Sequence, residues 1–137
     1  MTMPRPHSPR GARYRKRLGF LLGVYWAILF TATHVPMPAH DLPPHSDKTV
    51  HLVGYAVLAM LWTLWRSSRV GYGWRQDLQC LTVIGLYAVL DELLQFPVGR
   101  NPEILDVLAD CLGAVLGMGT VAIVFRWRSA DRPSGDE

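Results

Sequence analysis

The sequence predicts an all-α protein: an integral membrane bundle of four transmembrane helices with both termini in the cytoplasm. Half of the 137 residues are apolar, and they gather in four blocks: Leu18–Val35, His51–Trp65, Leu78–Phe96 and Leu105–Phe125. A bilayer-spanning helix needs about 20 mostly apolar residues, within a range of roughly 17–25. Three blocks reach this length, and the second does so when Thr49 and Val50 are included. A soluble helical bundle is disfavoured, because its helices should carry a charged stripe.

Prolines and capping residues set the limits of the first two helices. Pro36 follows the first block and predicts that its helix ends near Val35. Ser46 or Asp47 then makes a suitable N-cap for a second helix, which we expect to continue through Trp65.

Two further helices are predicted in the second half of the chain. The third begins near Asp77 and stops by Phe96, because Pro97 and a glycine follow it. The fourth is expected to begin around Pro102–Ile104, with Pro102 at the first helical position. It ends at 126–128, where arginine and tryptophan form an interface anchor.

The distribution of Lys and Arg predicts the orientation, because these residues collect in short cytoplasmic segments. Six lie in the first 17 residues, three between the second and third blocks, and three after the fourth block. The other two connections carry only Lys48 and Arg100. We therefore expect an uncleaved signal anchor, since no small-residue cleavage pattern follows the first block. The basic segment is read as a topology signal and a contact for anionic lipid, not for nucleic acid.

The chain is expected to form one domain with short extensions. Residues 1–17 are predicted to be a disordered basic arm, residues 18–128 the four-helix membrane domain, and residues 129–137 a polar tail. The cysteines, Cys80 and Cys111, have no metal-ligand spacing and lie within apolar blocks.

Acidic and amide side chains interrupt the apolar blocks. Ionisable residues at membrane depth are costly and usually mark function, and the predicted topology puts them all in the outer half. At about 100° per residue, Asp47, His51 and Tyr55 share one helix face, as do Asp91 and Gln95 on the next helix. We predict an outward-facing polar pocket made of Asp47, Lys48, His51, Tyr55, Asp91, Glu92, Gln95, Arg100, Asp106 and Asp110. The other histidines of this region, His34, His40 and His45, are expected to be solvated at the outer interface.

Two glycines continue the acidic stripe of the fourth block. Gly113 and Gly117 share a helix face with Asp106 and Asp110. The small-xxx-small spacing is typical of closely packed transmembrane helices. These two glycines are therefore predicted to form a helix-packing contact.

The combined pattern resembles the VanZ-like family, small bacterial membrane proteins related to a teicoplanin-resistance factor. The resemblance rests on Asp47-Lys48-x-x-His51-x-x-x-Tyr55, Asp91-Glu92-x-x-Gln95, Arg100 and Asp106-x-x-x-Asp110-x-x-Gly113-x-x-x-Gly117. It covers about residues 47–117 and implies a resistance role at the cell envelope. The family pattern usually carries Asn where this chain has Asp110, which adds an acid to the site.

Four functions are compatible with these residues. The first is a purely structural network of the polar groups, and the second is binding of an envelope amphiphile, with Arg100 and Lys48 holding an anionic head group. In an enzyme, a hydrolase or transferase, His51 would act as general acid or base beside Asp91, Glu92 or Asp106. A metalloenzyme would use His51 with two or three carboxylates. The fourth function is proton or ion transport through a carboxylate–histidine relay.

Of these, we predict amphiphile binding in a multi-pass protein of the bacterial inner (cytoplasmic) membrane. The expected partner is a membrane lipid or a lipid-linked envelope intermediate, and the expected role is tolerance to teicoplanin-type glycopeptides or envelope stress. No cofactor, metal or nucleic-acid partner is predicted. The sequence contains no HExxH or GxSxG motif that would favour an enzyme.

Overall fold

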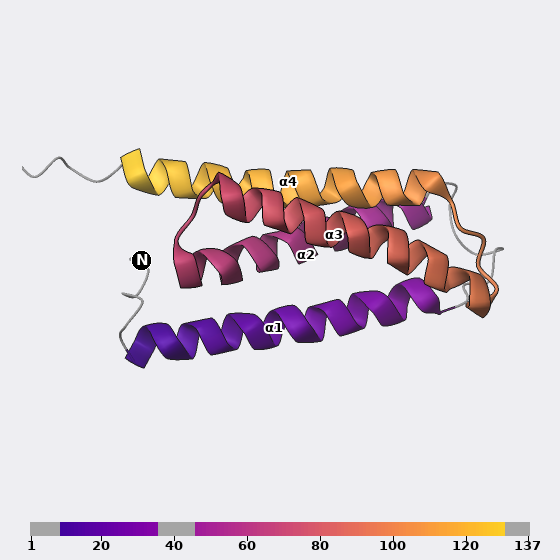
Figure 1. Cartoon of the computed structure of the whole chain (residues 1–137), viewed down its shortest axis with the longest axis horizontal. Helices are drawn as coiled ribbons and strands as arrows, with labels where there is room; N and C mark the ends of the chain where they lie inside the picture. The colour runs from indigo at the N-terminus through magenta and orange to yellow at the C-terminus, as the bar shows by residue number, and fades with distance from the viewer. Residues whose placement is uncertain (1–8, 36–45, 131–137) are drawn as a thin grey trace, which may run out of the picture.

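Four long α-helices make up the structure, a computed structural model that describes residues 9–35 and 46–130. They are α1 (Pro9–His34), α2 (Ser46–Val70), α3 (Trp74–Gln95) and α4 (Ile104–Ala130), with a short 3-10 helix, η1 (Phe96–Val98), after α3. Successive helices run in alternating directions, so the start of α1 and the end of α4 lie at the same end of the bundle (Figure 1). The all-α class is confirmed, and the described residues contain no strand.

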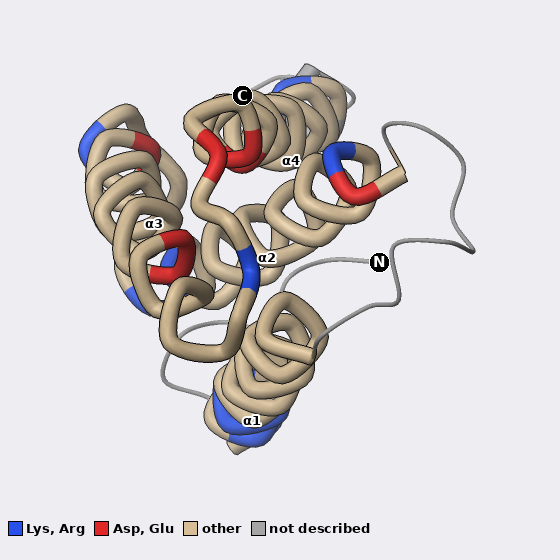
Figure 2. The backbone as a smooth tube through the Cα atoms, turned by 90° about the vertical axis from the view of Figure 1, so that its right-hand side faces the viewer, with Lys and Arg blue, Asp and Glu red and all other residues tan. Residues whose placement is uncertain are grey.

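The two ends of the bundle differ in charge. One end holds the last turns of α1 and α3 and the first turns of α2 and α4, and we name it the acidic end. Figure 2 looks onto this end and shows Asp and Glu on α2, on the last turn of α3 and at the start of α4. The opposite end, named the basic end, holds the Arg- and Lys-rich first turns of α1.

α1 is longer than the sequence predicted. It begins at Pro9, so residues 9–17, which we expected in a disordered arm, are helical. Proline is favoured at the first position of a helix, and the Arg and Lys residues that follow are good helix formers. Residues 1–8 lie outside the described residues. At the other terminus α4 continues to Ala130, two residues into the predicted polar tail, and residues 131–137 also lie outside the description.

The connection between α3 and α4 is held by backbone geometry. Pro97 lies in η1, and Gly99 follows with a φ of 81°, a left-handed conformation that favours glycine. The Arg100 amide donates to the Gln95 carbonyl at 3.2 Å. α4 begins at Ile104 and not at Pro102, and the Glu103 amide just before it donates to the Glu92 carboxylate.

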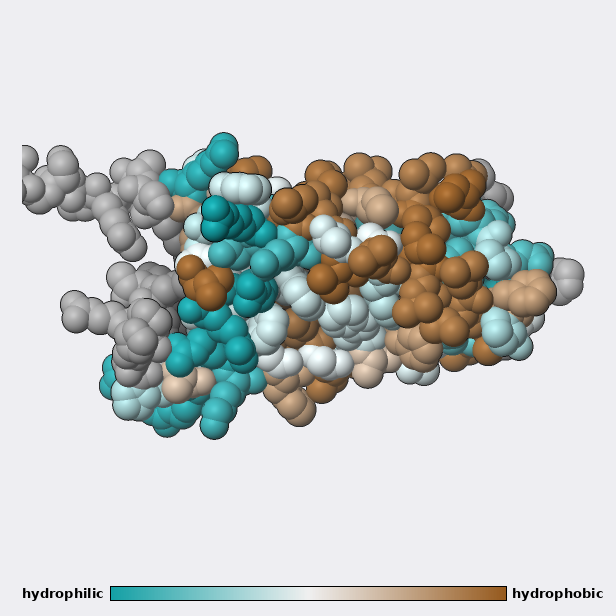
Figure 3. All heavy atoms as spheres, viewed as in Figure 1, coloured by the Kyte–Doolittle hydropathy of each residue, from teal (hydrophilic) through white to brown (hydrophobic). Residues whose placement is uncertain are grey.

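Polarity in the bundle is inverted relative to a soluble protein. Four carboxylate residues are at most 4% exposed: Asp91, Glu92, Asp106 and Asp110. By contrast, Phe20 is 71% exposed, Leu86 69% and Ile104 72%. Soluble proteins rarely bury acids or expose a continuous apolar surface. Figure 3 shows hydrophobic residues in a broad zone between hydrophilic residues at the two ends.

Within the described residues, two helices are long and apolar enough to cross a membrane by length and composition. They are the segments Trp74–Val98 and Ile104–Trp127. Crossing by all four helices stays a prediction, as does the orientation of the termini.

α2 is the central helix, because its contacts with the other three are the most extensive in the bundle. It supplies Tyr55, Leu58 and Ala59 to the apolar core, and each is fully buried. α1 joins this core through Trp26, whose ring lies edge-on to the rings of Trp62 on α2, at 5.9 Å, and of Tyr87 on α3, at 5.0 Å.

The backbones of α2 and α4 approach each other closely at two glycines of α4. A Cβ atom added at Gly113 would overlap the Leu52 carbonyl oxygen, and one added at Gly117 would overlap that of Ala56. The two glycines therefore let the α4 backbone lie directly on α2, as the small-residue spacing indicates.

This contact predicts that Gly113→Ala destabilises the protein. The added methyl group must push two backbones apart, and overpacking of this kind costs about 1–3 kcal/mol. Gly119→Ala is the matched control, because a Cβ there meets nothing within 4 Å and replacing a helical glycine by alanine gains up to about 1 kcal/mol. Unfolding of both variants in detergent micelles would be compared with wild type. Equal stability of the two variants would contradict the close α2–α4 contact.

Candidate polar site at the acidic end

A lysine-centred cluster lies at the rim of the acidic end. The Lys48 Nζ atom is 2.8 Å from a carboxylate oxygen of Glu103 and 3.2 Å from one of Asp106, and 3.6 Å from Asp47. Hydrogen bonds with Glu103 and Asp106 raise the pKa of Lys48 above its ordinary value, so the amine stays charged. Sequence reasoning missed Glu103, because it lies in the connection before α4, outside the helical spacing that selected the other acids.

Behind this rim, α2 and α4 meet through a buried histidine–aspartate pair. The His51 Nδ1 atom is 3.0 Å from the Asp110 Oδ1 atom, and both side chains are almost fully buried. The His51 ring stacks on Tyr55 with 6.4 Å between centroids, and Tyr55 in turn stacks on Tyr87 at 5.9 Å. One continuous column of rings thus connects the His51–Asp110 pair to α3.

Asp91 on α3 is held by residues of α1 and of its own helix. Its Oδ1 atom accepts hydrogen bonds from Thr33, at 3.2 Å, and from Tyr87, at 3.1 Å. The same oxygen is 3.7 Å from the Nδ1 atom of His34. The carboxylate is therefore the point at which α1 joins the polar site.

The prediction that His34 is solvated is wrong. Its side chain is only 12% exposed, because the last turn of α1 packs at the acidic end and the ring stacks on Phe30 at 4.0 Å. Thr33 was not predicted either. The sequence did contain a signal for both residues. Thr33 and His34 are polar residues at the end of the first apolar block, and this block ends at the acidic end of the bundle. His40 and His45 lie outside the described residues.

Glu92 and Arg100 fix the α3–α4 connection. Glu92 accepts from the Gln95 amide at 3.3 Å and from the Glu103 backbone. The Arg100 guanidinium donates to the Thr33 carbonyl at 2.8 Å. Among the described residues Arg100 forms no ion pair with a carboxylate, and its contact with another predicted site residue is the backbone hydrogen bond to Gln95.

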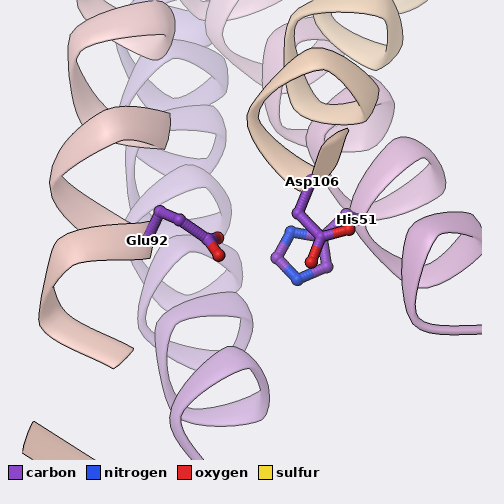
Figure 4. A group of neighbouring side chains, drawn as sticks. All are labelled: His51, Glu92 and Asp106. Carbon is purple, nitrogen blue, oxygen red and sulfur yellow. The ribbon is translucent and has the colours of Figure 1, made fainter. Parts of the chain in front are cut away.

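Three of these groups converge. Atoms of His51, Glu92 and Asp106 that can bind a cation all lie within 4.8 Å of one another, and the three side chains are buried. In Figure 4 the Glu92 carboxylate points from α3 towards the His51 ring, and Asp106 lies beside that ring. The predicted residues thus meet across α2, α3 and α4, with Arg100 at the edge.

Two apolar grooves open on the outside of the bundle next to this site. One, of about 430 Å³, lies between α1 and α2 and is lined by Tyr25, Ile28, Leu29, Ala32, Thr49, Val50, Val53 and Gly54. The other, of about 380 Å³, lies between α2 and α4 and is lined by Lys48, Thr49, Leu52, Leu105, Leu108, Ala109 and Leu112. Lys48 belongs both to the second groove and to the rim cluster.

Residues 15–126 match the VanZ/LLP1 family. No curated protein and no solved structure matches the chain.

The contacts of Asp91 predict that Tyr87→Phe destabilises the protein. The variant removes one donor from a buried carboxylate, and an incompletely satisfied buried group costs about 1–3 kcal/mol. The same change in an Asp91→Asn background should cost less, because the charge that needs the donor is gone. Thermal unfolding of the four members of this double-mutant cycle measures the coupling. A coupling of zero would show that the hydroxyl does not stabilise Asp91.

Proposed function

The chain belongs to the VanZ/LLP1 family, and from this premise we propose that it is a multi-pass protein of the bacterial cytoplasmic membrane. In this proposal all four helices span the bilayer, both termini are cytoplasmic, and the functional unit lies within residues 18–128. The inverted polarity of the bundle supports embedding in lipid. The concentration of Lys and Arg at the basic end supports the cytoplasmic location of that end.

We further propose that the acidic end binds the head group of a membrane amphiphile, a lipid or a lipid-linked envelope intermediate. The observation that carries this proposal is the position of the buried polar side chains directly beside an apolar groove. Lys48 lines the α2–α4 groove and contacts Asp106 of the polar site. An acyl chain in the groove would bring its head group to these residues.

The charges favour a head group rich in hydrogen-bond donors. Lys48 is already surrounded by three carboxylates, so it attracts an anion less than the sequence suggested. The buried carboxylates suit sugar hydroxyls or amines. Arg100 donates to one carbonyl, and a guanidinium has five N–H donors in all, so it is the better residue to hold a phosphate.

In the cell, this binding would contribute to tolerance of teicoplanin-type lipoglycopeptides or of envelope stress. Such compounds are themselves amphiphiles with sugar and amine groups. A purely structural network is a weaker explanation, because interhelical hydrogen bonds in membranes average only about 0.6 kcal/mol.

A second candidate is an enzyme, a hydrolase or transferase that acts on the same class of lipid-linked substrate. The observation that favours it is the His51–Asp110 pair, in which a carboxylate orients the imidazole. A histidine held in this way can act as general acid or base.

Reporter fusions test the proposed topology. Alkaline phosphatase fused after Gly99, in the α3–α4 connection, should be active because that connection lies on the outer face. The same enzyme fused after Gly71, between α2 and α3, should be inactive, and a fluorescent protein there should fold in the cytoplasm. The reverse pattern would overturn the topology.

Ligand binding is tested by Arg100→Ala and Asp91→Asn. Each change removes a charge-assisted contact of about 1.5–3 kcal/mol, which corresponds to a roughly 10- to 100-fold loss of affinity. The protein would be purified from membranes, the co-purifying lipids identified by mass spectrometry, and teicoplanin susceptibility measured in a sensitive host.

Asp77→Asn is the matched control, because Asp77 contacts Tyr72 near the basic end. It should leave both the bound lipid and the susceptibility unchanged. If all three variants are inserted normally and behave as wild type, amphiphile binding at the acidic end is refuted.

A further inference from the structure

We propose that His51, Glu92 and Asp106 form a binding site for one divalent transition-metal cation, with Zn²⁺ as the ion that the ligand set suits best. The inference goes beyond the proposed amphiphile binding and does not depend on it. It departs from our expectation that the chain holds no metal.

The first argument is the convergence of the three side chains. They come from three different helices, α2, α3 and α4, yet their ligand atoms lie within 4.8 Å of one another. Imidazole suits zinc and other transition metals, whereas carboxylates alone suit Mg²⁺ or Ca²⁺. One imidazole with two carboxylates is a ligand set that zinc accepts, since histidine and carboxylate ligands occur together in its three-ligand sites.

The second argument is the orientation of His51. Its Nδ1 atom is 3.0 Å from Asp110, which leaves Nε2 as the nitrogen for a metal. Metal-binding histidines almost always donate their other ring N–H to a carboxylate, a carbonyl or water, which fixes the ring and raises its basicity. Asp110 is therefore assigned as a positioning residue for the ligand His51.

The third argument is the excess of buried negative charge. Asp91 and Asp110 each have one buried carboxylate oxygen, Oδ2, without a hydrogen-bond partner among the described residues. Buried charges are normally paired or bound to a metal. Within the described part of the chain, the only ion pair between a lysine or arginine and a buried acid of this site joins Lys48, at the rim, to Asp106. A divalent cation would offset the remaining charge.

The existing hydrogen bonds hold the carboxylates in place: each oxygen of Glu92 accepts one hydrogen bond, and a carboxylate oxygen has a second lone pair that a metal can use. Asp106 binds Lys48 through Oδ1, and Glu92 is anchored by Gln95 and the Glu103 amide. Zinc bound at about 2.0–2.2 Å keeps its ligand atoms roughly 3.3–3.6 Å apart. The side chains must therefore move inward by about 1 Å, which carboxylate rotation allows. Three protein ligands leave the fourth position open for water or for a ligand oxygen.

The experiment measures zinc binding to the full chain, purified in detergent without a histidine tag and stripped of metal with a chelator. Isothermal titration with Zn²⁺ should show one saturable site per chain. Affinity should fall at least 100-fold in the His51→Ala/Glu92→Gln/Asp106→Asn variant. Asp110→Ala should weaken binding roughly 10- to 100-fold, as expected for a partner of a metal-binding histidine, and Asp110→Asn should restore part of the loss.

Asp77→Asn is again the control and should bind zinc as wild type does. Binding that survives in the triple variant would belong to other histidines of the chain and would overturn the proposal, as would the absence of saturable binding to wild type. Zinc-edge X-ray absorption of the loaded wild-type protein tests the ligands without relying on a folded variant. It should show nitrogen and oxygen at about 2.0–2.2 Å with one imidazole, and a shell with sulfur or without histidine would also overturn the proposal.

Discussion

The backbone contact between α2 and α4 determines where the polar side chains of the site lie. Gly117 and Gly113 place one helix directly on Ala56 and Leu52 of the other. This contact fixes the register, so about one turn nearer the acidic end Asp110 meets His51. About one turn further, Asp106 reaches Lys48. A larger side chain at the glycines would separate the helices and lengthen both polar contacts.

Buried charge explains why all four helices contribute to the acidic end. An ionised carboxylate in an apolar bundle is costly unless donors surround it. Asp91 accepts hydrogen bonds from Thr33 of α1 and Tyr87 of α3. Glu92 accepts one from a backbone amide of the α3–α4 connection. Apolar helix surfaces alone can pack in several arrangements. These polar contacts favour the one arrangement in which the buried carboxylates meet their donors.

The helices and the members of the site follow from the sequence because both depend on local periodicity. The 100° spacing places His51 and Tyr55 on one face and Asp106 and Asp110 on another, without knowledge of the neighbours. Which faces meet is a tertiary property, so the pairing of His51 with Asp110 was not predictable. His34 was misjudged for the same reason, since the last turn of α1 packs beside Asp91 of α3, far along the chain. The helical start of α1 was missed because its basic residues were read for charge and not for helix propensity.

The α3–α4 connection has a second role that limits how it can change. The Thr33 carbonyl is among the last four of α1, which have no partner within their own helix, and Arg100 caps it. The same short segment is also bonded to α3, because the Arg100 amide donates to the Gln95 carbonyl and the Glu103 amide donates to the Glu92 carboxylate. Surface loops usually tolerate insertions, but here an added residue would release the end of α1 and the anchor of Glu92 together. Variation in length is therefore expected in the other connections, while residues 96–103 keep a fixed number.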